Sequence, residues 1–147
     1  MKIGICSDHR GIYLKSSLIE YLEHAGYEVV NYGTDSADSV DFPEYAFKLG
    51  NGVIKKRVNY GIAICGTGIG MSIALNKMKG IYCAKINTIN EAVLCRSHNN
   101  ANVIAISADL DLDLVKSMVD KFINTPSSKE EKYVRRNNMI KDKENNG

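Results

Sequence analysis

The stretch that decides the fold is YGIAICGTGIGMS, residues 60–72. Its first half, Tyr60 to Cys65, is short and apolar, with charge before it and glycine after it, which is typical of a buried strand. Its second half leads through three glycines into Met71 and Ser72, which we interpret as the start of a helix. A glycine-rich turn of this kind leaves backbone N–H groups free beside the positive end of the helix dipole. The stretch therefore predicts a strand–loop–helix unit that can bind an anion.

Cys65 lies on the rim of this loop, where the same field would stabilise its thiolate, so it is a candidate base or nucleophile. The alternative is a tight turn whose glycines only permit close packing, and the stretch alone leaves both readings open. Two familiar motifs are excluded. The Rossmann fingerprint needs glycine where Met71 stands, and the P-loop needs a lysine after a glycine, which Gly66, Gly68 and Gly70 lack. Neither a dinucleotide nor ATP is favoured.

Strands and helices alternate along the rest of the chain. Such alternation predicts an α/β fold: a three-layer αβα sandwich with a five-stranded parallel sheet, Rossmann-like, and an added C-terminal helix. The predicted strands are Lys2 to Cys6, Tyr27 to Tyr32, Tyr60 to Cys65, Gly80 to Lys85 and Asn102 to Ser107. The predicted helices are Tyr13 to Ala25, Pro43 to Lys56, the turns after Gly70, Asn90 to Arg96, Leu112 to Asn124 and Ser128 to Lys141.

Composition narrows the class of protein. The chain has 147 residues, of which 44% are hydrophobic and 24% charged, so we expect one folded domain over residues 1–147 with a frayed tail at 141–147. A net charge of +2 does not favour nucleic acid, and no apolar run approaches the roughly 20 residues of a membrane span. Four cysteines show neither CxxC nor zinc spacing. The N-terminal residues lead directly into a predicted strand, so we expect no signal peptide. We expect reduced thiols, no metal and a cytoplasmic protein.

Polar clusters follow three of the predicted strands. In parallel sheets, ligands bind beyond the carboxyl ends of the strands. Asp8, which follows the first predicted strand, can orient a hydroxyl group, or it can cap the next helix. His98 can take part in proton transfer, or it can interact only with a helix C-terminus. Arg136 can reach a phosphate, or it can belong to a solvated helix face. The residues themselves leave these alternatives open.

Five stretches occur in an order that is typical of one family. They are Ser7 to Gly11, Asp41 to Ala46, Ile64 to Ser72, Asn76-Lys77 and Arg96 to Val103. With them the chain resembles the type B ribose-5-phosphate isomerases, whose fold the related galactose-6-phosphate isomerase subunits share. The resemblance runs from Met1 to about Ile140. The cysteine–glycine loop followed by a downstream His-Asn-x-Ala-Asn makes it specific.

The resemblance implies an aldose–ketose isomerase that interconverts ribose 5-phosphate and ribulose 5-phosphate through a cis-enediolate. Cys65 matches the family's base, which moves a proton between C1 and C2 of the open-chain sugar. Thr67 and His98 match residues that open the furanose ring, and Asp8 matches one that orients a hydroxyl or the ring oxygen. No cofactor is implied, because a proton transfer needs neither a hydride carrier nor an electron sink.

Substrate contacts are implied in the same way. Phosphate contacts are matched by His9 and Arg136, with Lys132 at a further phosphate position, and a hydroxyl contact by Asn99. The backbone N–H groups of the glycine loop match the family's binding site for the enediolate oxygen. From the loop alone, we would have expected a phosphate group there. Its residues are Gly66, Gly68, Ile69, Gly70 and Met71.

The chain also departs from the family. Ser128 to Tyr133 occupies the place of a Gly-Gly-Arg-His stretch in the family, so that Lys132 is found where the family has an arginine. Asp109 is found where the family has another arginine that contacts the phosphate. A hexose 6-phosphate of the allose or galactose type is therefore an alternative substrate, and a non-catalytic sugar-phosphate-binding protein is an alternative function. The resemblance further implies a homodimer or homotetramer with active sites shared between subunits.

Overall fold

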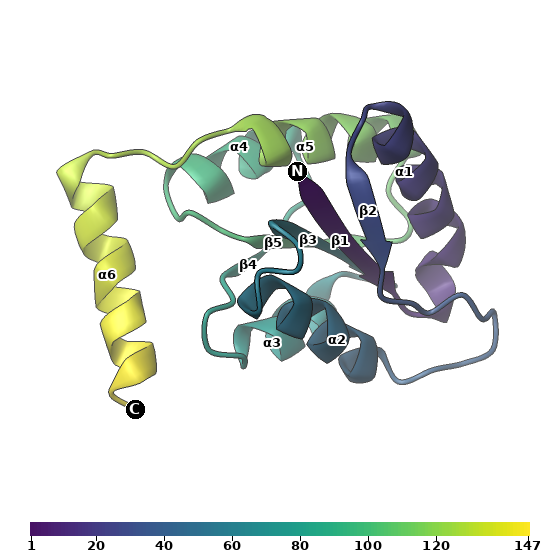
Figure 1. Ribbon diagram of the computed structural model, residues 1–147, viewed down its shortest axis with the longest axis horizontal. Coiled ribbons are helices and arrows are strands. Elements are labelled where there is room, and N and C mark those ends of the chain that lie inside the picture. Colours follow the sequence, from purple (N-terminus) through teal and green to yellow (C-terminus); the bar gives the residue numbers. More distant parts are fainter.

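The computed structural model, which describes residues 1–147, confirms the predicted α/β architecture. Five parallel strands form one sheet in the order β2-β1-β3-β5-β4, and helices cover both of its faces (Figure 1). The strands are β1 (Lys2–Ser7), β2 (Glu28–Asn31), β3 (Tyr60–Cys65), β4 (Cys83–Lys85) and β5 (Val103–Ser107). The helices are α1 (Ile12–His24), α2 (Phe42–Ile54), α3 (Ile69–Asn76), α4 (Ile89–Ser97), α5 (Leu112–Asn124) and α6 (Glu131–Asn145), with a 3-10 turn, η1 (His9–Gly11).

The two faces of the sheet differ in the size of their side chains. On one face, isoleucines of β1, β3 and β5 pack against α1, α4 and α5. On the other face, small residues such as Ala63 and Ala105 pack against α2 and α3. Because successive residues of a strand point to opposite faces, Cys65 lies on this second face. The small side chains there let α2 and α3 approach the sheet closely.

Helix α2 shows the effect of this close packing. Gly50 and Gly52 lie inside α2, where glycine lowers helix stability, yet the helix is continuous through both positions. A Cβ at Gly50 would lie 2.3 Å from Met78 Sδ, and one at Gly52 would lie 2.1 Å from Tyr32 Oη. The Met78 and Tyr32 side chains therefore pack directly against the backbone of α2, and a larger residue at either glycine would displace them.

The C-terminal region differs from its sequence-based prediction. Helix α6 begins at Glu131 rather than Ser128, and it continues to Asn145, through most of the tail that was expected to be frayed. Near its end, the Glu144 carboxylate accepts hydrogen bonds from Gly80 N–H and Tyr82 O–H. No residue of α6 is buried, and the helix stands apart from the α/β body (Figure 1).

The loop between β2 and α2 is held by a buried lysine. Lys15 of α1 is 1% exposed, and its ammonium group donates to Asn31 Oδ1 and forms an ion pair with Asp35. Further along the same loop, Val40 N–H donates to His9 Nδ1 at 3.2 Å. The lysine thus fixes a loop that in turn orients His9 at the carboxyl edge of the sheet.

We predict that Asp35→Asn lowers the free energy of unfolding at pH 7 by about 1–2 kcal/mol, since it leaves the buried ammonium group with less compensation. The hydrogen bond from Lys15 holds the pKa of Asp35 below its ordinary value. This stabilisation is present above the ordinary carboxyl range and is lost as pH falls through the lowered pKa. Thermal unfolding of wild type and variant should therefore differ at pH 7 and converge as pH falls below the ordinary carboxyl range. Asp38→Asn is the matched control, and equal losses in both variants would contradict the role of Lys15.

Candidate active site

The glycine loop folds back onto Cys65. Gly68 has a φ of +80°, and a Cβ at this position would lie 3.0 Å from the backbone carbon of Ile106 in β5. Both features require glycine. In this conformation Gly68 N–H donates to Cys65 Sγ at 3.2 Å. The loop thus places a backbone N–H donor directly against the sulfur of Cys65.

Cys65 differs from the other cysteines in its surroundings. It is 5% exposed and lies next to the glycine loop at the end of β3. Burial raises the pKa of the Cys6 and Cys83 thiols far above the ordinary value and raises that of Cys95 to about 11. These three groups therefore stay protonated at neutral pH. All four cysteines are free thiols.

The loop also supplies backbone donors. The first turn of α3 leaves N–H groups such as those of Gly70 and Met71 without an intrahelical acceptor. Thr67 is exposed on the loop, and its hydroxyl oxygen accepts from Ile69 N–H at 3.1 Å. Ser107 Oγ donates to Gly66 O at 2.7 Å, which ties the loop to the end of β5. The arrangement can hold an oxyanion close to the sulfur of Cys65.

Asp8 and His9 follow β1 at the same edge. Asp8 Oδ1 accepts a hydrogen bond from Arg10 N–H at 2.9 Å, so its carboxylate caps the short helical turn η1. Capping the next helix was one of the two roles that the sequence left open for Asp8. Asp8 is 7% exposed. Because His9 Nδ1 accepts from Val40 N–H, the hydrogen of the neutral ring is on Nε2, which can donate to a ligand. Asp109, at the end of β5, is exposed at this edge too.

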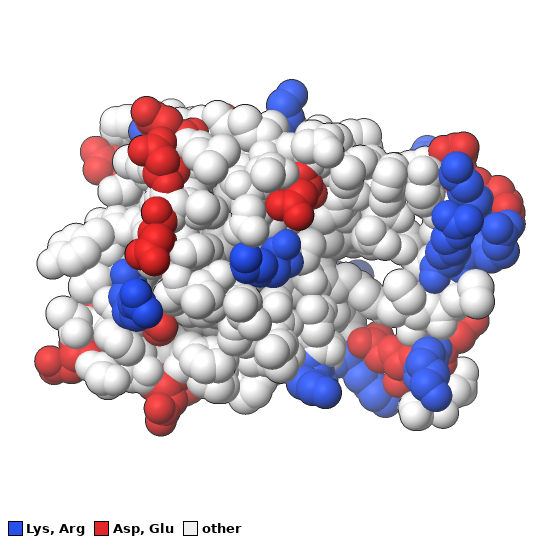
Figure 2. All heavy atoms as spheres, turned by 180° about the vertical axis from the view of Figure 1, so that it is seen from behind, with Lys and Arg blue, Asp and Glu red and all other residues white.

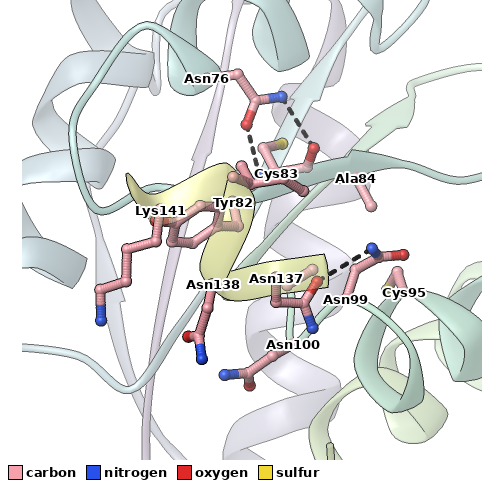
Figure 3. Close-up of a pocket in the computed structure, with 12 residues that line it drawn as sticks. Asn76, Tyr82, Cys83, Ala84, Cys95, Asn99, Asn100, Asn137, Asn138 and Lys141 are labelled. Carbon is pink, nitrogen blue, oxygen red and sulfur yellow. Dashed lines mark hydrogen bonds between the residues drawn. The ribbon is translucent and has the colours of Figure 1, made fainter. Parts of the chain in front are cut away.

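A second group of predicted site residues lies around α4 and α6. His98 caps the C-terminus of α4, and its ring stacks on that of Tyr133 with a centroid distance of 4.3 Å. Asn137 Nδ2 donates to His98 O at 2.9 Å, and Asn99 contacts Asn137 Oδ1 at 3.4 Å (Figure 3). Lys132 and Arg136 are one turn apart on α6 and exposed.

A buried arginine holds the backbone that carries His98 and Asn99. Arg96 is 6% exposed, and its guanidinium donates to Thr125 O, Asn100 Oδ1 and Ala101 O. It also lies 4.8 Å from the centroid of the Tyr60 ring. The turn after α4 is therefore rigidly attached to the body even though its side chains are exposed.

The two groups lie at opposite edges of the sheet. Cys65 pairs with Ser107 at the carboxyl end of β5, whereas His98 precedes Val103, the first residue of that strand. Five residues of strand separate the edges by roughly 16 Å. Within one chain, the structure therefore brings Asp8, His9 and Thr67 to Cys65 and does not bring His98, Asn99, Lys132 or Arg136 there. Sequence reasoning did not anticipate this separation.

A cavity of about 400 Å³ lies beside the second group, between α6 and the body. Asn99, Asn137, Asn138 and Lys141 line it together with Tyr82 (Figure 3). The space-filling view shows the same hollow next to α6, where lysine, arginine and acidic side chains gather (Figure 2). The residues of α6 that line the hollow are mixed, with Asn137, Asn138 and Lys141 beside the apolar Ile140.

The chain holds no group of three or more His, Cys, Asp or Glu side chains that could bind a metal ion. A helix long and apolar enough to cross a membrane is not found.

Comparison with known proteins gives consistent matches over nearly the whole chain. The family described as Ribose/Galactose Isomerase matches residues 3–140. A putative sugar phosphate isomerase of Bacillus subtilis is 42% identical over 107 residues, which cover 72% of each chain. Ribose-5-phosphate isomerase B of Escherichia coli is 40% identical over 123 residues, or 83% of each chain. The crystal structure of ribose-5-phosphate isomerase B from Mycoplasma genitalium with bound ribulose-5-phosphate superposes with a TM-score of 0.94 at 34% identity, covering 99% of this chain and 97% of that one.

Proposed function

The chain belongs to the ribose/galactose isomerase family and is an aldose–ketose isomerase, and we propose that it interconverts ribose 5-phosphate and ribulose 5-phosphate. The observation that carries this proposal is the thiol of Cys65 with Gly68 N–H on its sulfur, at the mouth of a loop of backbone donors. The names of two relatives support the pentose phosphate as substrate, since one is a ribose-5-phosphate isomerase B and another was crystallised with ribulose-5-phosphate.

In the proposed reaction the Cys65 thiolate removes the proton from C2 of the open-chain aldose. The electron pair of the broken C–H bond forms the C1–C2 double bond, and the charge moves to the oxygen at C1, giving a cis-enediolate. A proton moves from the oxygen at C2 to the oxygen at C1, which becomes a hydroxyl. The electron pair of the C1–C2 double bond then takes the proton from Cys65 at C1, the oxygen at C2 forms the carbonyl of the ketose, and the thiolate is regenerated. N–H groups of the glycine loop, which no side-chain motion has to assemble, stabilise the developing oxyanion.

The remaining residues have supporting roles in this proposal. Asp8, whose carboxylate is fixed by the turn it caps, orients a sugar hydroxyl or the ring oxygen. Thr67 and His98 open the furanose ring, and Asn99 binds a hydroxyl of the substrate. His9, Lys132 and Arg136 contact the phosphate. Two of these groups, the ring of His98 and the cations of α6, lie at the edge of the sheet opposite Cys65 within one chain.

A second copy of the chain resolves this separation. Helix α6 buries none of its residues, and Val134, Met139 and Ile140 on it are exposed. Beside the glycine loop, Ile69 and Ile73 of α3 are 53% and 58% exposed, an apolar surface next to the catalytic thiol. A two-fold contact would cover both surfaces and bring the His98 group of one subunit to Cys65 of the other. We therefore infer at least a homodimer with two shared sites.

Replacing Cys65 tests the base. Cys65→Ala should lower kcat for ribose 5-phosphate by about 10²–10⁴-fold or more, because it removes the proposed general base. Cys83→Ala, which removes a protonated thiol away from the loop, is the control and should keep near-wild-type turnover. A panel with allose 6-phosphate and galactose 6-phosphate, assayed for ketose, tests the substrate. Near-normal turnover by Cys65→Ala would refute the mechanism, and faster conversion of a hexose 6-phosphate would refute the pentose assignment.

Hybrid proteins test whether sites are shared. Subunits carrying Cys65→Ala and subunits carrying His98→Asn, co-expressed with different tags, should form mixed dimers in which one site has both mutations and the other has none. Such dimers, isolated by both tags, should regain about half of the wild-type activity, whereas each variant alone should remain impaired. If the mixed dimers are no more active than the parent variants, Cys65 and His98 act within one subunit and the shared site is ruled out.

A further inference from the structure

Arg10 lies over the glycine loop with an unpaired guanidinium group. An added Cβ at Gly66 would meet Arg10 Nη1 at 2.7 Å, Cζ at 3.1 Å and Cδ at 3.3 Å, so the arginine side chain runs across this glycine. The only hydrogen bond of Arg10 to a side chain uses its backbone N–H, which Asp8 accepts. The guanidinium takes part in none of the four ion pairs of the chain. Its donors are therefore available to a ligand.

The position of Arg10 follows from the order of the strands. His9 and Arg10 come directly after β1, Gly66 after β3 and Asp109 after β5, and these strands are consecutive in the sheet. By reaching across to Gly66, the Arg10 guanidinium lies over the middle of the three loops. Neighbouring strands are about 4.8 Å apart, so groups on the two outer loops are within reach of the same small ligand.

Arg10 is also the one residue with a permanent positive charge in these loops. The residues that follow β1, β3 and β5 include three carboxylates, Asp8, Asp109 and Asp111, and neither lysine nor a second arginine. A sugar phosphate brings almost two negative charges at neutral pH. Arg10 is therefore the one permanent cation in these loops that can attract the phosphate and offset the repulsion from the nearby carboxylates.

We propose that Arg10 binds the phosphate group of the substrate and is a specificity-determining residue of this enzyme. The inference rests on the proposed function in that it takes the substrate to be a sugar phosphate. The planar guanidinium can donate two parallel hydrogen bonds to phosphate oxygens, and His9 Nε2–H, from the same turn, adds a third donor. The capping of η1 by Asp8 holds both side chains in place.

Kinetics of Arg10→Gln test the proposal. KM for ribose 5-phosphate should rise about 10-fold or more while kcat changes little, because contacts to the phosphate are shared by the ground and transition states. Inhibition by inorganic phosphate should weaken by a similar factor, whereas turnover of unphosphorylated D-ribose, however slow, should be the same in both proteins. Arg57→Gln, an exposed arginine at the opposite edge of the sheet, is the matched control.

A rescue variant distinguishes charge from packing. Asp109→Arg places a cation on the neighbouring loop, so it should lower KM more in the Arg10→Gln background than in wild type, a non-additive result. If Arg10 only covers Gly66, Arg10→Gln will leave KM and the phosphate inhibition constant unchanged, and the proposal is overturned. Should wild type fail to isomerise ribose 5-phosphate, the proposed function fails instead, and calorimetric titration of both proteins with inorganic phosphate still decides the role of Arg10.

Discussion

The close approach of Gly68 to β5 is the constraint on which the site depends. Its left-handed backbone and the 3.0 Å between its missing Cβ and the Ile106 carbon leave no room for a side chain. This contact turns the chain sharply after β3, so that Gly68 N–H reaches Cys65 Sγ and the first N–H groups of α3 face the same space. One backbone contact therefore positions the sulfur and the oxyanion donors together.

The packing of the sheet explains why this geometry is possible on one face only. Isoleucines of the three central strands fill the face under α1, α4 and α5. The face under α2 and α3 carries Ala63, Cys65 and Ala105, whose small volumes allow α3 and its loop to lie close to the strands. A cysteine at the end of β3 is thus both a small core residue and a reactive group at the rim of the loop.

Sequence patterns predicted much of the fold and only part of the site. The alternating strands and helices, the strand before the glycines and the helix after them follow from local periodicity and turn residues, as the structure confirms. The path of α6 to Asn145, the close packing at Gly50 and the position of Arg10 over Gly66 depend on contacts between distant segments. Such contacts follow from strand order, which periodicity does not encode. The placement of His98 at the edge opposite Cys65, in contrast, already follows from the predicted parallel sheet, because His98 precedes β5 whereas Cys65 ends β3.

The fate of the C2 hydrogen tests the central claim, a proton transfer by Cys65, most directly. Ribose 5-phosphate labelled with deuterium at C2 would be converted in ordinary water, and the ribulose 5-phosphate examined by mass spectrometry and NMR at short times. If the Cys65 thiol exchanges its proton with solvent, the product should lose deuterium and carry a hydrogen from solvent at C1. Cys65→Ala should show neither the loss of deuterium nor the incorporation of solvent hydrogen. Complete retention of the label at C1, with no solvent hydrogen incorporated, would indicate direct hydride transfer and would contradict the account.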